Sequence, residues 1–332
     1  MLIGIPKEIM HGERRVSAIP ETVAKLVKDG AEVWVEKSAG EGAFFHDNQY
    51  VQAGAKIVDD VAVIYEKADV ILKVKEPQFN HEKNLHEVDM MHADQVLITF
   101  IHPASPVNHD MVRAMAKKGV VGLTLDGVPR ITRAQSMDAL TSMSTCAGYK
   151  GILLAANELP KFIPQIFSAV GMIKPINALI VGVGVGGLQA LATAKRLGAV
   201  VYAADIRPAA SEQAKSLGAK VIELGVPPEA AIGEGGYALP LSDEWLEKER
   251  AVLAAELPKM DIVFLSALVP SRIAPILITE DMVKAMKPGA AIVDISIDQG
   301  GNCEITPPGE VEVKHNVTLI AVSYTHLRAH ET

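Results

Sequence analysis

The chain has little cysteine, few aromatic residues and no excess of positive charge. Its 332 residues include two cysteines and 5% aromatic residues, and its net charge is −8. Two cysteines, Cys146 and Cys303, are too few for a disulfide framework and fit a reducing cytosol. Because nucleic-acid binding needs a basic surface, the acidic balance argues against a nucleic-acid partner.

The sequence also lacks a secretion signal and a membrane-spanning segment. The N-terminal MLIGIPKE shows no signal-peptide pattern. Residues 176–194 carry no charge over about the length of a membrane span. Their four glycines indicate a strand, a turn and a helix instead. We therefore predict no transmembrane helix.

The stretch 177–207 holds the most informative pattern in the chain. A buried strand, Ala178–Val181, leads into Gly182-x-Gly184-x-x-Gly187 and then into the helical stretch Leu188–Leu197. A second strand, Ala199–Ala204, follows. Glycine-rich turns alone are common, but this order of strand, glycines, helix and strand is the dinucleotide-binding fingerprint. The first glycine permits a tight turn, the second admits a pyrophosphate, and the third lets helix and strand pack closely.

Asp205 follows the second strand directly and predicts which dinucleotide binds. A carboxylate there accepts hydrogen bonds from both ribose hydroxyls and repels a 2′-phosphate, so NAD(H) is favoured over NADP(H). Arg207 nearby weakens that preference. The cofactor contacts predicted along this stretch are Gly182, Gly184, Val185, Gly187, Asp205, Ile206 and Arg207.

The fold class predicted is α/β, with two doubly wound Rossmann-like domains, parallel sheets and a cofactor cleft between them. Residues 1–125 alternate between strands and helices, which implies a mostly parallel sheet covered on both faces. No glycine fingerprint occurs there. The predicted divisions are a first domain at 1–138, the NAD-binding domain at 139–310, a strand at 311–322 returning toward the first domain, and a non-native tail at 323–332.

Two connecting segments differ in the structure that we predict for them. The turn-rich residues 126–144 lead into a long helix expected from about Ala147 to Phe167. Residues 225–244 form a long loop rich in glycine and proline, and such loops inside compact domains are usually functional or disordered. We interpret this loop as a mobile lid with Tyr237 near its tip; the alternative is an inert insertion.

The last ten residues, SYTHLRAHET, do not resemble the rest of the chain. A covering helix is expected after the strand Val317–Val322, and none follows. His326 and His330 invite a metal interpretation, but the segment resembles translated cloning or sequencing adapter, and we exclude it from fold reasoning. We predict no metal site.

With these residues in hand, the chain resembles one superfamily along nearly its whole length. This superfamily comprises alanine dehydrogenases and the NAD(H)-binding component of proton-translocating NAD(P) transhydrogenase, its alpha subunit. The shared pattern includes IGIPKE, GERRV, AGEGA, KVKEP, GVGVGGLQALATAKRLGA and MKPGAAIVD.

Several stretches are similar to the transhydrogenase branch in particular. They are PRITRAQSMD at 129–138, the GGYA lid, the run ELPKMDIVFLSALVPSRIAPILIT and GGNCEITPPGEVEVKH. The resemblance implies cofactor contacts at Arg130, Gln135, Ser136, Met137, Asp138, Gly236, Tyr237 and Leu268. It also implies that Gln135, Asp138 and Tyr237 act at the reacting nicotinamide. Without the resemblance, residues 130–138 favour a solvated capping turn over cofactor contacts.

Four residues favour the other branch. Arg15, Lys75, His102 and Asp298 fall where alanine dehydrogenases carry their catalytic residues, and transhydrogenases commonly differ at the last three of these positions. Arg15 and Lys75 would hold the carboxylate and carbonyl of a 2-oxo acid. His102 would move the proton at C2, and Asp298 would orient ammonia. Each of the last three also has a structural alternative. Lys75 would end a strand at the surface, His102 would be a capped histidine at a strand end, and Asp298 would cap a loop.

The sequence therefore supports two functions. In the first, the chain binds NAD(H) and passes hydride between NADH and NADP⁺ held on a partner subunit. The resemblance then implies a homodimer, an NADP(H)-binding subunit and a membrane proton-channel subunit, which hold the chain in the cytoplasm against the inner face of the cell membrane. In the second, it is a self-contained alanine dehydrogenase that reductively aminates pyruvate with NADH. We favour the first, because its matching stretches cover more of the chain.

Overall fold

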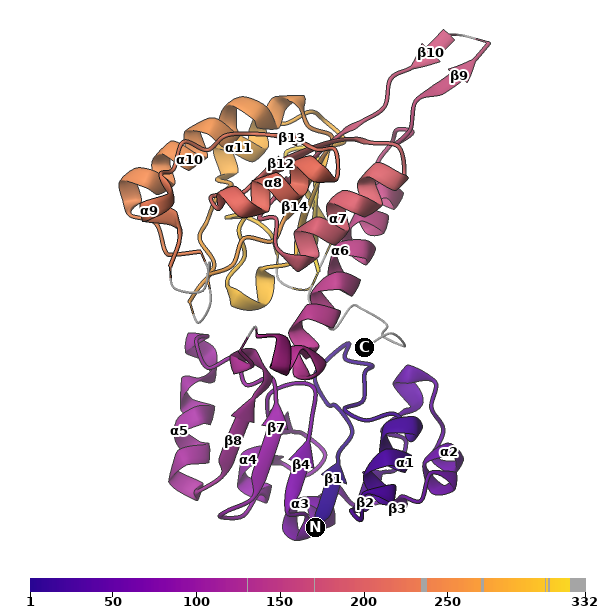
Figure 1. Cartoon of the computed structure of the whole chain (residues 1–332). Coiled ribbons are helices and arrows are strands. Elements are labelled where there is room, and N and C mark those ends of the chain that lie inside the picture. The colour runs from indigo at the N-terminus through magenta and orange to yellow at the C-terminus, as the bar shows by residue number, and fades with distance from the viewer. Residues whose placement is uncertain are drawn as a thin grey trace. The chain divides into compact units, whose positions relative to one another are not determined.

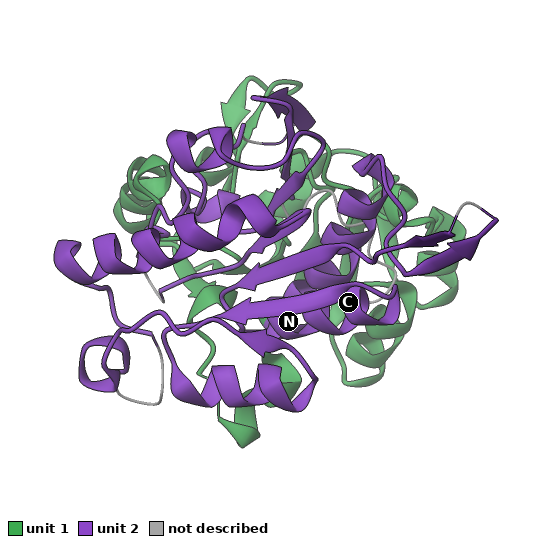
Figure 2. Cartoon of the chain, turned by 90° about the horizontal axis from the view of Figure 1, so that it is seen from above, with its two compact units in different colours: residues 1–140, 328–332 green, residues 141–327 purple. Residues whose placement is uncertain are grey.

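Strands and helices alternate along the chain and build two separate sheets, one in each of two units (Figures 1 and 2). The computed structural model describes residues 1–129, 131–169, 171–233, 238–269, 272–307, 309 and 311–322. Within these ranges unit 1 is Met1–Leu140, and unit 2 runs from Thr141 to residue 322. The division falls two residues after the boundary that the sequence predicts at 138.

The sheet of unit 1 has six parallel strands in the order β3-β2-β1-β4-β7-β8. The strands are β1 (Leu2–Ile5), β2 (Glu32–Glu36), β3 (Lys56–Val58), β4 (Val70–Leu72), β7 (Val96–Thr99) and β8 (Val121–Thr124). The helices are α1 (Pro20–Lys28), α2 (Asp47–Gln52), α3 (Val61–Lys67), α4 (Glu87–Met90) and α5 (His109–Lys118). A small antiparallel pair, β5 (Phe79–Asn80) and β6 (Leu85–His86), lies outside this sheet.

Helices cover both faces of this sheet. On one face, Ile3 and Ile5 of β1 pack with Val23 of α1 and Tyr50 of α2. A second cluster joins the sheet to α3, α4 and α5 on the other face. Successive side chains of a strand point to opposite faces, so a doubly wound unit buries both sets. The strand order reverses between β1 and β4, and residues that follow these strands gather at that switch point.

The sheet of unit 2 has seven strands in the order β13-β12-β11-β14-β15-β17-β16. They are β11 (Asn177–Val181), β12 (Val200–Ala204), β13 (Lys220–Val221), β14 (Ile262–Leu265), β15 (Ala291–Asp294), β16 (Val311–Lys314) and β17 (Val317–Ala321). All neighbours are parallel except β16, which runs antiparallel to β17 at the edge. The α/β class with Rossmann-like sheets is therefore confirmed.

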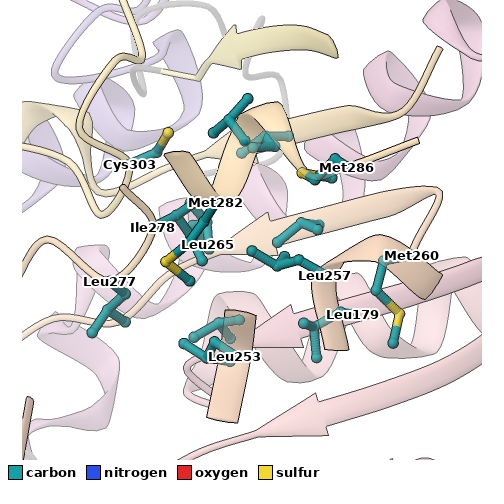
Figure 3. Close-up of a cluster of buried hydrophobic side chains, with 14 of the residues drawn as sticks. Leu179, Leu253, Leu257, Met260, Leu265, Leu277, Ile278, Met282, Met286 and Cys303 are labelled. Atoms are coloured by element: carbon teal, nitrogen blue, oxygen red, sulfur yellow. The ribbon is translucent and has the colours of Figure 1, made fainter. Parts of the chain in front are cut away.

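The helices of unit 2 pack around a large apolar core. They are α6 (Ala139–Glu158, which begins at the end of unit 1), α7 (Val185–Arg196), α8 (Pro208–Ser216), α9 (Pro228–Ala231), α10 (Asp243–Glu256) and α11 (Glu280–Lys284). Figure 3 shows the cluster in which Leu253 of α10 and Leu257, which follows α10 directly, meet Leu179 of β11 and Leu265 of β14. This burial is the main stabilising contribution to the unit.

Two sequence predictions are wrong. The helix expected at 147–167 is α6, which begins at Ala139 and ends at Glu158. Pro160 and Pro164 cannot continue a helix, and residues after them form β9 (Ile166–Ser168). Near the N-terminal end of α6, Thr145 Oγ1 donates to the backbone carbonyl of Thr141 at 2.9 Å. This hydrogen bond allows a polar side chain to lie within the helix.

The second correction concerns residues 311–322, which the sequence predicts to return toward the first domain. Instead β16 and β17 complete the sheet of unit 2, where β17 pairs with β15 from Ala291↔Thr318 to Asp294↔Ala321. Val317, Leu319 and Ala321 are almost fully buried there. Pairing with β15 stabilises this apolar strand, because its backbone forms hydrogen bonds there and both of its faces are buried.

Strand β9 pairs antiparallel with β10 (Gly171–Ile173) and forms a hairpin that projects from the rest of unit 2 (Figure 1). Phe167 is 77% exposed and Met172 53% exposed on it. None of the described helices is long and apolar enough to cross a membrane.

Candidate dinucleotide site

The glycine loop between β11 and α7 has the geometry that a pyrophosphate site needs. Gly182 adopts φ +84°, a left-handed conformation that favours glycine, and a Cβ there would approach the Ala267 nitrogen to 2.6 Å. A Cβ on Gly187 would collide with the carbonyl oxygen of Gly182. Gly184 is different, because a Cβ there would meet nothing within 4 Å. Two glycines are thus required by packing, and the third leaves open space where a ligand can approach.

Gly184 lies directly before the first turn of the helix α7. Gly184 is the N-cap of the twelve-residue helix α7, and its carbonyl accepts from Leu188 N at 2.8 Å. The N–H groups of the first turn have no carbonyl partner within the helix, and the helix dipole makes this end positive. Val185 lies in this turn. The residues present therefore fit the pyrophosphate of a dinucleotide.

Asp205 is linked to the glycine loop directly. Its side chain is 4% exposed, and its Oδ2 accepts from Val183 N at 2.7 Å. Arg207 donates to the same carboxylate from its backbone N at 2.8 Å, from Nε at 3.0 Å and from Nη2 at 2.8 Å. A ribose diol that approaches Asp205 therefore competes with the Arg207 guanidinium for the same two oxygens. Ile206 between them packs against the core of unit 2.

Loops that follow β14 and β15 hold the other side of the glycine loop. Ser266 Oγ donates to the Gly182 carbonyl at 2.7 Å. The Asn302 amide binds Ala267 twice, since Oδ1 accepts from Ala267 N at 2.9 Å and Nδ2 donates to Ala267 O at 2.8 Å. Leu268, a predicted cofactor contact, is the next residue and is half-buried.

Asp294 anchors this arrangement from the end of β15. Its carboxylate accepts from the backbone N–H groups of Ser296, Asn302 and Cys303 at 2.7–3.0 Å. Burial raises the pKa of Asp294 to about 6, although these three N–H groups act in the opposite direction. Sequence reasoning missed Ser266, Asp294 and Asn302. Two patterns could have pointed to them. Asp294 is the polar residue that ends the apolar run AIVD, and Asn302 ends the triplet GGN.

The residues of the PRITRAQSMD stretch lie in unit 1. Gln135, Ser136 and Met137 belong to the 3₁₀ helix Thr132–Met137 and are exposed. Asp138 is half-buried, and its N–H donates to the Gln135 carbonyl at 3.3 Å.

Three other predicted residues, Arg130, Gly236 and Tyr237, lie outside the described residues, as does the tail with His326 and His330. The base of the proposed lid is described. Ile232 and Ala238 form an antiparallel bridge, and Leu239 N donates to Ala231 O at 2.9 Å. These contacts bring residues 231–232 beside residues 238–239.

Three members of the alternative residue set gather in unit 1. Arg15 is 5% exposed and forms a bidentate pair with Glu13, with Nε at 2.8 Å and Nη2 at 2.6 Å from its two oxygens. Lys75 follows β4 and is 4% exposed, so it is not a surface strand end. The positive charge of Lys75 helps to lower the pKa of Glu13 and acts against the raised pKa of His102.

His102 follows β7 and lies between two carboxylates. Its Nδ1 is 3.4 Å from Glu76 Oε2, and its Nε2 is 3.5 Å from Asp126 Oδ1. Burial lowers the pKa of His102, but Glu76 and Asp126 outweigh burial, so the pKa is raised above its usual value. Asp298, the fourth member, lies in the 3₁₀ helix Ile297–Gln299 of unit 2 and is half-buried.

Among the described residues, no group of three or more His, Cys, Asp and Glu side chains is arranged to hold a metal ion.

Comparison with known proteins matches both units. Residues 4–147 match the N-terminal domain of the alanine dehydrogenase/PNT family, and residues 151–327 match its C-terminal domain. The first of the polypeptides that make up the NAD(P) transhydrogenase alpha subunit of Rhodospirillum rubrum is 43% identical over 323 residues, which are 96% of this chain and 83% of that protein.

Two further comparisons separate the branches. The crystal structure of a transhydrogenase from Sinorhizobium meliloti superposes with a TM-score of 0.82 at 36% identity, covering 99% of this chain and 88% of that one. An alanine dehydrogenase of Staphylococcus saprophyticus is 34% identical, covering 92% of this chain and 75% of that protein. The predicted resemblance to transhydrogenase alpha subunits is confirmed, and alanine dehydrogenases are more distant. The chain belongs to the alanine dehydrogenase/PNT family.

Proposed function

We propose that this chain is the NAD(H)-binding alpha subunit of a proton-translocating NAD(P) transhydrogenase. It is then an oxidoreductase that passes hydride between NADH and NADP⁺ held on a partner subunit. The observation that carries the proposal is the glycine loop with Asp205 and the open Gly184, in a chain 43% identical to a transhydrogenase alpha subunit.

The reaction needs few chemical groups from this chain. The bound nicotinamide supplies or accepts the hydride. The first turn of α7 and Gly184 would hold the pyrophosphate, and Asp205 would hold the adenosine ribose once its bonds to Arg207 are released. Ser266 and Asn302 hold the loop after β14 against Gly182. Such preorganisation accelerates a transfer reaction by fixing the approach of the two reactants.

Gln135, Asp138 and Tyr237 complete this assignment at the nicotinamide end. Arg130, Ser136, Met137, Gly236 and Leu268 are further proposed contacts. The bridge between Ile232 and Ala238 supports a lid, because it closes the base of the segment that carries Tyr237.

The proposed partners are a second copy of this chain, an NADP(H)-binding subunit and a membrane proton-channel subunit. The chain would act in the cytoplasm, at the inner face of the cell membrane, through these partners. The β9–β10 hairpin supports a homodimer, because exposed apolar side chains on a projecting hairpin, such as Phe167 and Met172, are typical of an interface.

A Gly184→Val variant tests the cofactor site. Gly184 has φ −83° and ψ −161°, which valine also adopts, and open space beyond its Cα. The variant should therefore fold normally, yet its side chain would occupy the pyrophosphate position. We expect titration calorimetry to detect NADH binding to the wild type and at least about a tenfold weaker affinity in the variant. Equal affinities at equal melting temperatures would contradict the proposal.

The gathering of Arg15, Lys75 and His102 favours a second candidate function, that of an alanine dehydrogenase. Two buried cations and a histidine between carboxylates suit a 2-oxo acid. Mixing the chain alone with NADH, pyruvate and ammonium distinguishes the two functions. We expect no NADH oxidation unless the NADP(H)-binding partner and NADP⁺ are present. Turnover by the chain alone that is lost in a His102→Ala variant would establish the second function instead.

A further inference from the structure

Asp294, at the end of β15, is a fully buried acidic residue without a counter-charge. Within the described ranges, its carboxylate forms no ion pair with a lysine, arginine or histidine. A buried charge without such a pair lowers stability unless hydrogen bonds replace the lost hydration. Here the hydrogen bonds come from backbone N–H groups, so the surrounding chain is built to hold an anion.

The turn that follows β15 wraps around this carboxylate. Asp294 Oδ1 accepts from Ser296 N at 2.9 Å. Its Oδ2 accepts from Asn302 N at 2.7 Å and from Cys303 N at 3.0 Å. Gly301 adopts φ +79°, and a Cβ there would lie 3.1 Å from the same oxygen. Backbone N–H groups that converge in this way form a concavity that favours a negative charge.

Direct contacts connect this turn to the glycine loop of the dinucleotide site. The Asn302 side chain binds both backbone groups of Ala267, at 2.9 Å and 2.8 Å. Ala267 N lies so close to Gly182 that a Cβ on Gly182 would approach it to 2.6 Å. Ser266 Oγ donates to the Gly182 carbonyl at 2.7 Å. The contacts therefore run without a gap from Asp294 through Asn302 and Ala267 to Gly182.

Few titratable groups face Asp294. Between their bounds, its neighbours in the sheet, β14 and β17, carry no charged residue. Cys303 is the titratable residue that touches it, and burial raises the pKa of the Cys303 thiol. The charged residues of the turn and of the helices α6, α7 and α11, which pack near β15, are all at least partly exposed: Lys150, Glu158, Lys195, Arg196, Glu280, Asp281, Lys284, Asp298 and Glu304.

The charge of Asp294 is finely balanced. Burial raises the pKa of Asp294 to about 6, although the three N–H groups act in the opposite direction. The ionised carboxylate accepts from all three N–H groups through charge-assisted hydrogen bonds, which are about twice as strong as bonds between neutral groups. Protonation removes the charge and places a hydrogen on one of the two oxygens. The contacts that hold Asn302 therefore weaken when Asp294 is protonated.

We propose that Asp294 is a positioning residue of the dinucleotide site, whose ionised carboxylate holds the loop after β14 in the conformation that binds NAD(H). The inference rests on the proposed function. The ionised form favours the turn in which Asn302 reaches Ala267, whereas the protonated form leaves Gly182 with weaker support. The affinity for NADH should therefore rise with pH as Asp294 ionises. If Asp294 served only stability, its replacement would change the affinity by the same factor at every pH.

The test measures the dissociation constant for NADH by titration calorimetry at about pH 5 and about pH 8. NADH carries no group that ionises between these values. We expect the wild type to bind about tenfold more weakly at the lower pH, because the ionised fraction falls to about a tenth one pH unit below the pKa of Asp294. In Asp294→Asn, whose amide keeps the shape of the neutral carboxyl, the affinity should match that of the wild type at the lower pH and should not change with pH.

A second variant interrupts the contacts without removing the titrating group. Asn302→Ala leaves Asp294 in place but removes the side chain that binds Ala267. Its affinity for NADH should therefore also be independent of pH. The control is Asp281→Asn, because the Asp281 side chain on α11 is 89% exposed and takes no part in these contacts. The control should reproduce the wild-type affinity at both pH values.

The outcomes are distinct. Absence of NADH binding to the wild type at both pH values would overturn the proposed function and this inference together. Equal wild-type affinities at the two pH values would overturn the inference alone, as would a pH dependence that persists in Asp294→Asn or in Asn302→Ala. If neither variant folds, the wild-type profile decides. A rise in affinity with a midpoint near pH 6 would then support the inference, and a midpoint elsewhere would overturn it.

Discussion

Replacing Asn302 with alanine should separate the loop after β14 from the rest of the dinucleotide site. Asn302 is fully buried, and its side chain makes four hydrogen bonds. Its Oδ1 accepts from Ala267 N at 2.9 Å and from Ser296 Oγ at 2.8 Å. Its Nδ2 donates to Ala267 O at 2.8 Å and to Pro275 O at 2.9 Å.

The expected loss of stability follows from these four bonds. An unsatisfied buried polar group costs about 1–3 kcal/mol, and the four costs are not additive because Ser296 and the loop can adjust. We expect the free energy of unfolding of unit 2 to fall by about 4 kcal/mol. Because the loop carries Leu268 and contacts Gly182, the affinity for NADH should also fall about tenfold.

Urea unfolding followed by fluorescence measures this change in unit 2 alone. The chain has two tryptophans, Trp34 on β2 of unit 1 and Trp245 on α10 of unit 2. In a Trp34→Phe background the signal reports unit 2. Asn157→Ala is the control, since Asn157 is exposed and makes one 3.1 Å bond to Glu158. A loss below about 1 kcal/mol in Asn302→Ala, or unchanged NADH affinity, would refute the reasoning.

Three further predictions follow. Lys73→Met should reduce the stability of unit 1 to urea by about 3–5 kcal/mol. Its Nζ lies 3.2 Å from Glu8 and 3.0 Å from Glu87, both buried; a loss near zero would show that the carboxylates are neutral. Glu249→Gln should gain about 3 kcal/mol of stability over the wild type between pH 4 and pH 8. Because the pKa of Glu249 is raised to about 7 in the folded chain, its contribution to the free energy of unfolding is full below pH 4.5 and is lost as the pH rises through 7. A difference in urea midpoints between the two proteins that does not change with pH would contradict this. Gly187→Ala should weaken NADH binding at least about tenfold in calorimetry, since its methyl group meets the carbonyl of the first glycine, and wild-type affinity would show that the turn adapts.

The alternative residue set illustrates what sequence patterns leave open. Arg15, Lys75 and His102 are far apart in the chain, and their separate patterns equally suit a strand end and a capped histidine. They follow β1, β4 and β7, which are neighbours in a parallel sheet, and the carboxyl ends of such strands share one edge. Strand order is a property of the whole sheet, so no local pattern predicts it.

The sequence by itself determined the dinucleotide fingerprint and the α/β class. β11, α7 and β12 form where periodicity and glycine spacing predict them, since these signals act over a few residues. Asp205 was found in the same way. Residues 311–322 were misplaced, because an apolar strand pattern does not say which sheet it joins.

Only the tertiary structure decided the contacts made across long chain separations. Asn302 binds Ala267 because packing of the core of unit 2 brings these segments together. A buried asparagine or glutamate looks like a surface residue in the sequence. Its role depends on burial and on its neighbours, and both follow from the folded chain rather than from local pattern.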